Sequence, residues 1–195
     1  PADEYGYEFR IASGDYQPEA NTAVMDWTTY NFILSSNVKL YGGFAGTEKS
    51  LSERKAGNET TLSGLAAGNI QTISVVRGSD AKGVIIDGFT IRNGEKGIFL
   101  TSDTNSEVKV KDCRIEDNTV NGVQASSTTR IEIDSSVIAN NGTTASNSEG
   151  GGINAAGSAI TLKDSTLIGN KAQYHGGAVF FGVSPTVKNP TLIAE

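Results

Sequence analysis

The sequence has little cysteine, histidine and proline, and it has no long apolar run. Its 195 residues include one cysteine, one histidine and four prolines. The single cysteine, Cys113, excludes an intramolecular disulfide, and the single histidine, His175, excludes a metal site built mainly on histidine. No stretch approaches the roughly 20 consecutive apolar residues of a membrane-spanning helix, so we expect no transmembrane segment in this chain.

Basic residues are outnumbered by acidic ones. The chain has 16 Lys and Arg against 22 Asp and Glu, a formal net charge of −6. This balance opposes binding to nucleic acids or to anionic membranes through bulk charge, so we expect no nucleic-acid partner. Glycine, in contrast, is abundant, with 23 residues. Much glycine with little proline indicates many turns rather than disorder.

Five segments of the chain align with one another without gaps. They begin at residues 84, 108, 131, 160 and 185 and read VIIDGFTIRNG, VKVKDCRIEDN, IEIDSSVIANN, ITLKDSTLIGN and PTVKNPTLIAE. Successive segments start 24, 23, 29 and 25 residues apart. The third position is aliphatic in every copy (Ile86, Val110, Ile133, Leu162, Val187), and so is the eighth (Ile91, Ile115, Ile138, Leu167, Leu192). Such a repeat predicts that both columns form a buried core.

The pattern within each segment is typical of strands. Its first positions alternate apolar and polar residues, which is the period of a β-strand. After a loop of variable length, a glycine opens a second apolar run, at Gly97, Gly122, Gly152 and Gly177. A short strand cannot bury its apolar face alone, but stacked units share a continuous core. The repeat therefore predicts an all-β fold, a single-stranded parallel β-helix (a solenoid), right-handed as parallel crossovers usually are.

Asparagine recurs at the last position of three successive segments, as Asn118, Asn141 and Asn170. Asparagine tolerates left-handed backbone conformations and bonds to nearby backbone groups. We therefore expect these three side chains to form a stacked ladder at a turn.

The pattern is less regular upstream, and we expect one continuous domain with two parts. Residues 37–195 form the β-helix coils, and residues 1–36 form an N-terminal cap with the first irregular strands. Five of the six tyrosines and the only tryptophan, Trp27, lie in the first 41 residues. A solenoid must cover its first coil, which favours an aromatic cap; a carbohydrate-stacking surface is the alternative. No C-terminal cap is visible before Glu195, so we expect a fragment of a longer protein.

Two stretches carry a family resemblance. VKLYGGFAGTEKSLSERKAGNETTLSG (residues 38–64), followed by VIIDGFTIRNG, resembles bacterial secreted right-handed parallel β-helix proteins, in which Tyr-Gly-Gly-Phe-x-Gly-Thr-Glu precedes the regular coils. LIGNKAQYHGGAV (residues 167–179) is similar to the polymorphic outer-membrane protein repeat, with Leu167 in place of its phenylalanine. The resemblance spans roughly residues 9–195 and implies a secreted or surface-attached protein, often an adhesin-like passenger. Similar coils also occur in polysaccharide lyases.

The best candidates for catalysis form an outward column at the fourth position of the segments. Asp87, Lys111 and Asp134 occupy it in successive units, and paired strands lie about 4.8 Å apart, so Lys111 would lie between two carboxylates. A lyase or hydrolase could use them as acid and base or to bind calcium. A solvated sheet also alternates charges to avoid repulsion, and the column continues with Lys163 and Lys188. We favour this ion ladder and assign no catalytic residue.

Two further residues have reactive side chains. Cys113 occupies an inward position and has no histidine nearby in the pattern to activate it, so we expect a small buried side chain. His175 lies in a loop, and we expect it to be solvated. The sequence predicts no metal and no cofactor, with calcium required only if the protein is a lyase.

These observations favour a non-catalytic module, an adhesin-like or glycan-binding scaffold secreted by a bacterium or carried on its cell surface. Its expected partners are a polysaccharide or a host or cell-surface protein. The alternative is a polysaccharide lyase or glycoside hydrolase acting on a bacterial, plant or host polysaccharide. The longest spacing falls in GTTASNSEGG (residues 142–151), and this loop is expected to be mobile and to be the place where a partner binds.

Overall fold

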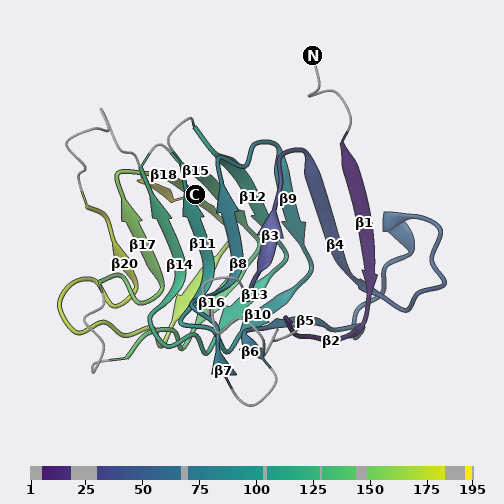
Figure 1. Ribbon diagram of the computed structural model, residues 1–195, viewed down its shortest axis with the longest axis horizontal. Helices are drawn as coiled ribbons and strands as arrows, with labels where there is room; N and C mark the ends of the chain where they lie inside the picture. Colours follow the sequence, from purple (N-terminus) through teal and green to yellow (C-terminus); the bar gives the residue numbers. More distant parts are fainter. Residues whose placement is uncertain are drawn as a thin grey trace.

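The computed structural model describes residues 6–18, 30–66, 70–102, 105–127, 129–143, 149–182 and 192–194. Strands make up nearly all of its regular structure, together with one short 3-10 helix, η1 (Leu51–Glu53). Each turn of the chain adds one strand to each of three parallel sheets, which we call A, B and C. The turns stack along the long axis of the molecule, from β1 at one end towards β20 at the other (Figure 1). The chain is therefore a parallel β-helix, as the repeat predicted.

The three sheets share one order of strands along the stack. Sheet A contains β1 (Tyr7–Ala12), β4 (Val38–Phe44), β9 (Val84–Asp87), β12 (Glu107–Lys111), β15 (Arg130–Asp134), β18 (Ala159–Lys163) and β21 (Leu192–Ala194). Sheet B contains β2 (Gly14–Tyr16), β5 (Thr60–Ser63), β10 (Thr90–Arg92), β13 (Arg114–Glu116), β16 (Val137–Ala139) and β19 (Thr166–Ile168). Sheet C contains β3 (Phe32–Leu34), β8 (Ser74–Ser79), β11 (Lys96–Thr101), β14 (Asn121–Ser126), β17 (Ile153–Ala156) and β20 (Val179–Phe180). A small antiparallel hairpin, β6 (Leu65–Ala66) and β7 (Ile70–Gln71), branches off between β5 and β8.

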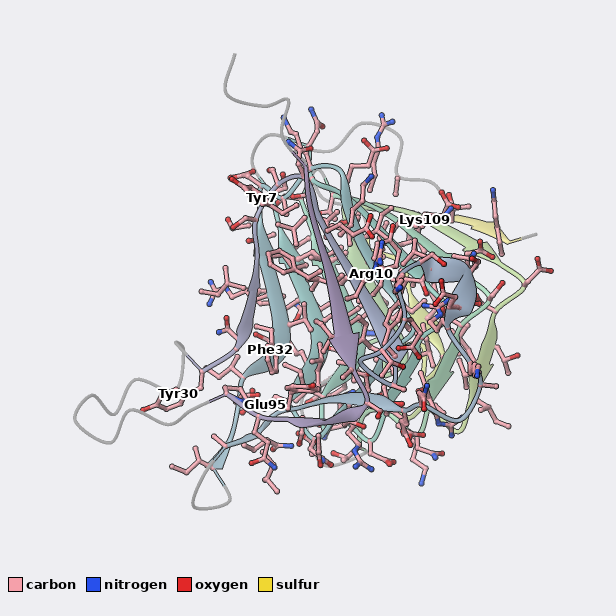
Figure 2. All side chains as sticks on the ribbon, turned by 90° about the vertical axis from the view of Figure 1, so that its right-hand side faces the viewer. Tyr7, Arg10, Tyr30, Phe32, Glu95 and Lys109 are labelled. Carbon is pink, nitrogen blue, oxygen red and sulfur yellow. The ribbon has the colours of Figure 1, made fainter. Side chains whose placement is uncertain are left out.

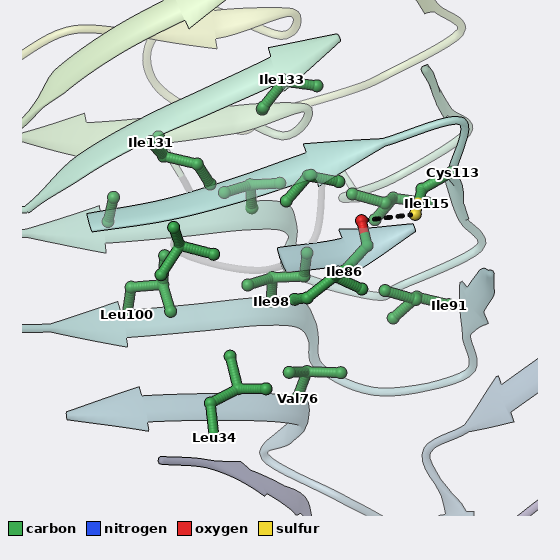
Figure 3. Packing of buried hydrophobic residues seen from close by; sticks show 14 of the residues in the cluster. Leu34, Val76, Ile86, Ile91, Ile98, Leu100, Cys113, Ile115, Ile131 and Ile133 are labelled. Carbon is green, nitrogen blue, oxygen red and sulfur yellow. Dashed lines mark hydrogen bonds between the residues drawn. The ribbon is translucent and has the colours of Figure 1, made fainter. Parts of the chain in front are cut away.

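The inward side chains of the three sheets form one apolar core. Ile115 and Ile138 are fully buried, which confirms the prediction made for their column. Figure 3 shows this cluster, with side chains from all three sheets meeting between them. Cys113 is also buried, as expected, and its thiol donates to the carbonyl oxygen of Ile86, with 3.5 Å between Sγ and O.

The sharp corners between sheets depend on residues with left-handed backbone conformations. The corner between sheets A and B (the A/B corner) has them at Gly88, Asp112, Ser135 and Asp164. The corner between sheets B and C (the B/C corner) has them at Asn93, Asp117, Asn140 and Gly169. Glycine, asparagine and aspartate adopt this conformation more readily than other residues. At the B/C corner the left-handed residue precedes each predicted ladder position and is not the ladder asparagine itself.

The asparagine ladder is present at the B/C corner. The side-chain Nδ2 of Asn118 donates to Asn141 Oδ1 (2.9 Å), and the side-chain Nδ2 of Asn141 donates to Asn170 Oδ1 (3.0 Å). The same Asn141 nitrogen also donates to the Ile115 carbonyl (2.9 Å), and the backbone N–H of Asn118 donates to Asn141 Oδ1 (3.1 Å). Asn118 and Asn141 are fully buried. The ladder therefore satisfies backbone groups that the bend would leave without partners.

Close packing against this ladder explains why glycine recurs at the start of the second apolar run. A Cβ on Gly97 would lie 2.6 Å from the Gly122 carbonyl oxygen and 2.8 Å from the Asn118 amide nitrogen. A Cβ on Gly122 would meet Asn141 in the same way, at 2.8 Å. Any larger residue would push the coil away from the asparagines, so glycine and asparagine recur together.

The alignment of the fifth segment was wrong. It placed Leu192 beside Leu167 in sheet B, whereas β21 pairs with β18 in sheet A, with Leu192 opposite Ile160. The preceding residues of that segment, Val187 and Lys188 among them, lie outside the described residues. The error has a physical origin, because an apolar triplet at the end of the chain suits a strand in any of the three sheets.

The described strands before residue 37 belong to the coil itself. β1 belongs to sheet A, β2 to sheet B and β3 to sheet C. Tyr7 and Phe9 stand in register with Val38 and Leu40 but are 62% and 50% exposed, because β1 is the edge strand of sheet A. Trp27 lies outside the described residues, and the aromatic cap stays a prediction.

Candidate functional site on the outer face of sheet A

The predicted outward column has the expected register. Lys111 on β12 lies opposite Asp87 on β9 and opposite Asp134 on β15. Lys163 on β18 continues the column beyond Asp134. Lys111 and Asp134 are partly exposed, and Asp87 is 7% exposed. The structure thus brings the three candidate residues together on one face.

The ion pairs differ from the predicted ladder. Asp87 is bound by Arg54, with 2.5 Å between Oδ1 and Nη1. The Nζ atom of Lys111 lies 3.7 Å from Asp112, its neighbour in sequence. Asp134 accepts a hydrogen bond from Ser135 Oγ at 3.0 Å. A basic residue from outside the repeat therefore neutralises Asp87, and Lys111 bridges neither of its column neighbours.

Arg54 was missed by the sequence analysis. It follows η1 in the insertion between β4 and β5, and its guanidinium also lies 3.6 Å from Asp112 and donates to the Gly42 carbonyl at 3.4 Å. A Cβ on Gly88 would lie 2.7 Å from Arg54 Nη1. The absence of a side chain at Gly88 therefore leaves the space that Arg54 occupies at the A/B corner. The family resemblance of the Tyr-Gly-Gly-Phe stretch was the one sequence signal that pointed to this insertion, and it did not indicate a role for Arg54.

Glu48 fixes the start of the same insertion. Its carboxylate accepts hydrogen bonds from the backbone N–H groups of Ala45 (2.9 Å), Gly46 (3.0 Å) and Thr47 (3.0 Å). Chiefly the bond from Ala45, together with the other backbone bonds, lowers the pKa of Glu48 below its usual value. Hydrogen bonds to the charged form of a carboxylate favour that form. In the Tyr-Gly-Gly-Phe-Ala-Gly-Thr-Glu motif, the final glutamate therefore stabilises the turn that begins the insertion.

A groove of about 580 Å³ crosses the strands of sheet A beside the column. Its floor includes a second outward column, formed in register by Ile85, Lys109, Glu132 and Thr161 on β9, β12, β15 and β18. Lys109 Nζ lies 2.9 Å from Glu132 Oε1, and this hydrogen bond is the main reason why the pKa of Lys109 is raised. Figure 2 looks along the stack from the β1 end and labels Lys109 on this face.

These contacts limit the chemistry of the column. A general acid or base must reach the proton that it transfers, but Asp87 is buried against Arg54. Asp134 and Lys111 are partly exposed, but together they offer only one carboxylate, whereas a glycosidase uses two. Within the described residues, no group of three or more His, Cys, Asp or Glu side chains could hold a metal ion.

The two other reactive residues are placed as expected. His175 is exposed in its loop, and its Nδ1 lies 3.1 Å from Glu149 Oε1. Burial raises the pKa of the Cys113 thiol to about 12, so the thiolate does not form at neutral pH. Residues 144–148 of the long loop lie outside the described residues, so the prediction of mobility there stays untested. None of the helices in the described parts of the chain is long and apolar enough to cross a membrane.

Comparisons with known proteins agree with this architecture. Residues 55–192 match the family described as the right-handed β-helix region. No curated protein and no solved structure gave a significant match. The match covers β5 to the start of β21, which are the coils that the repeat predicted, and it agrees with the expected right-handed winding. The chain belongs to the right-handed β-helix family.

Proposed function

We propose that the protein is a non-catalytic, extracellular or cell-surface scaffold of a bacterium, adhesin-like or glycan-binding. The observation that carries the proposal is the groove over β9, β12, β15 and β18. It presents side chains from four successive coils at fixed register on a sheet whose inner face is fully packed. An extended polymer or a flat protein surface suits such a regular, open face better than a small substrate does.

The cellular location in this proposal rests on two sequence motifs. The Tyr-Gly-Gly-Phe-Ala-Gly-Thr-Glu stretch and the Gly176-Gly177-Ala178 turn resemble those of secreted and surface-attached bacterial coils. The expected partners are a polysaccharide or a host or cell-surface protein, with no cofactor.

A polysaccharide lyase or glycoside hydrolase is the second candidate, because Lys111 does lie between Asp87 and Asp134 in register. It would need calcium if it cleaved by elimination, as the sequence analysis noted. The engagement of Asp87 by Arg54 supports the scaffold over the enzyme.

One experiment separates the two candidates. Purified protein is incubated with pectins, alginates and neutral polysaccharides in the presence of calcium, and binding, ultraviolet absorbance of unsaturated products and release of new reducing ends by hydrolysis are followed. We expect binding without product. Product formation that disappears in Lys111→Ala would establish the enzyme and overturn the scaffold proposal.

A further inference from the structure

The outer face of sheet C carries a different kind of column. Phe99, Gln124, Asn154 and Phe180 stand in register on β11, β14, β17 and β20. Their neighbours along each strand, such as Val123 beside Gln124, are buried in the core or, beside Phe180, partly buried against it, so these four side chains alternate to the outside. Two amides thus lie side by side between two aromatic rings.

The two rings already have partners. The guanidinium of Arg77 lies 5.6 Å from the Phe99 ring centre, and Lys96 Nζ lies 5.4 Å from it. The ring of Phe180 stacks on His175 with 5.6 Å between centres. The two rings are therefore held by neighbouring side chains, and the amides of Gln124 and Asn154 lie between them.

A hollow of about 420 Å³ lies over the two amides. Lys96, Glu149 and Tyr174 line it together with Gln124 and Asn154. Tyr174 is 61% exposed. The Asn121 amide anchors the far wall by donating to the Glu149 carbonyl at 2.8 Å and to the adjacent Gly150 carbonyl at 2.7 Å. The volume lies within the range of small-ligand sites, and the walls are held by the scaffold.

Each of the two amides keeps an unused acceptor. Gln124 Oε1 and Asn154 Oδ1 are shielded from solvent, and neither has a hydrogen-bond partner. A shielded acceptor without a donor is unfavourable, and such groups in native proteins call for an explanation. The last torsion of an amide side chain is soft, and rotation about it changes where the oxygen points without moving the backbone.

We propose that this hollow, which we call the sheet C site, binds a neutral hexose unit of a glycan. Sugar hydroxyls donate and accept hydrogen bonds, as the amides of Gln124 and Asn154 do. Tyr174 offers an exposed ring for the apolar face of the sugar. The cationic Lys96 and the anionic Glu149 balance one another, and the net charge of −6 disfavours polyuronates. The inference rests on the glycan-binding form of the proposed function and gives it a site and a ligand class.

The test uses the full chain and a panel of trisaccharides followed by NMR titration. The panel contains gluco-, manno-, galacto- and xylotriose, with trigalacturonate as the acidic probe. The Gln124→Ala/Asn154→Ala variant, each of its single variants and Tyr174→Ala are compared with Arg114→Ala/Glu116→Ala, an ion pair on β13 of sheet B away from both the groove and the sheet C site. Thermal melts confirm that each variant folds.

We expect a neutral trisaccharide to bind, with affinity falling about tenfold or more in the double amide variant. Tyr174→Ala also weakens binding, whereas Tyr174→Phe and the sheet B pair retain it. Neutral binding that is unchanged by the amide variants would overturn the sheet C site and leave the proposed function intact. Preference for trigalacturonate, or for xylotriose, which consists of pentose units, would overturn the ligand class. No binding by any glycan would remove both this inference and the glycan-binding form of the proposed function, leaving a protein partner.

Discussion

The two corners that flank sheet B are stabilised in different ways. At the B/C corner, Asn118 and Asn141 each bond to the next asparagine of the ladder, and all three asparagines bond to backbone groups of a neighbouring coil. At the A/B corner, the equivalent column is Cys113, Ser136 and Ser165. There a backbone N–H donates to the next hydroxyl, Cys113 to Ser136 Oγ and Ser136 to Ser165 Oγ, both 3.1 Å. Cys113 and Ser165 also donate to carbonyls of the preceding coil, at 3.5 and 3.3 Å, but none of these three side chains bonds to two acceptors and two donors as Asn141 does.

The A/B corner receives additional support where its column ends. Phe89 precedes Cys113 in the column and offers no polar side chain, and at this coil Arg54 reaches in from the insertion to bind Asp87. The comparison shows two solutions to the same problem of bending a strand. One solution repeats within the coil, and the other is supplied once from a distant part of the chain.

The largest expected effect is loss of a rung of the asparagine ladder. Asn141→Ala leaves the buried backbone N–H of Asn118 without an acceptor and the Ile115 carbonyl without its side-chain donor, whereas the Asn118 side-chain amide keeps the carbonyls of Ile91 and Glu116. At about 1–3 kcal/mol for each unpaired buried group, we expect a loss of about 2–4 kcal/mol in the free energy of unfolding. Urea unfolding measures it. Lys171→Ala, an exposed change at the same corner, serves as the control, and equal stability of the two variants would contradict the ladder's role.

Removal of Arg54 ranks next. Arg54→Ala leaves Asp87 buried and unpaired, but Arg54 itself is partly exposed, so we expect a loss of about 1–3 kcal/mol. Asp87→Asn in the Arg54→Ala background should restore part of that loss, because it removes the uncompensated charge. Unfolding of the four proteins of this cycle gives the coupling energy. Additive effects would show that the contact between Arg54 and Asp87 contributes little.

These two corners also show what the sequence could and could not predict. The asparagine ladder was visible, because identical residues recur at the spacing of the coil and each copy faces the same neighbours. The register of Asp87, Lys111 and Asp134 followed from the same spacing. Arg54 occurs once, 33 residues before its partner, so no periodicity could reveal it.

The candidate sites follow the same division. The sequence indicated the outward column on sheet A, because its charges alternate with the repeat. It did not indicate the sheet C site, because Glu149 and Tyr174 come from loops of different lengths and meet the amides only in the folded coil. The misplaced fifth segment has a related cause: beyond the last regular coil, the pattern alone does not say which sheet a short strand joins.

A smaller effect is expected for the serine column. Ser136→Ala removes the acceptor of the buried Cys113 N–H and a hydroxyl that donates to the Asp134 carbonyl at 2.8 Å. We expect a loss of about 1 kcal/mol, clearly below that of Asn141→Ala, because the Ser136 hydroxyl makes only one bond to the neighbouring coil. The same urea titrations provide the measurement. A loss as large as that of Asn141→Ala would mean that the two corners are equally dependent on their ladders.

The smallest effect concerns Glu48, which holds the insertion that carries Arg54. Because the backbone N–H bonds lower the pKa of Glu48 in the folded protein, its contribution to stability is present above the ordinary carboxylate pKa of about 4.3 and is lost as the pH falls through the folded pKa. Glu48→Gln should therefore lower the melting temperature slightly at neutral pH, and the difference from the parent protein should shrink towards zero in acid. Glu107→Gln, an exposed change on β12 outside the insertion, is the control. An NMR titration of Glu48 checks the cause directly, since a pKa at the ordinary value would mean that the three backbone bonds do not hold the loop in solution, and that Arg54 reaches Asp87 without them.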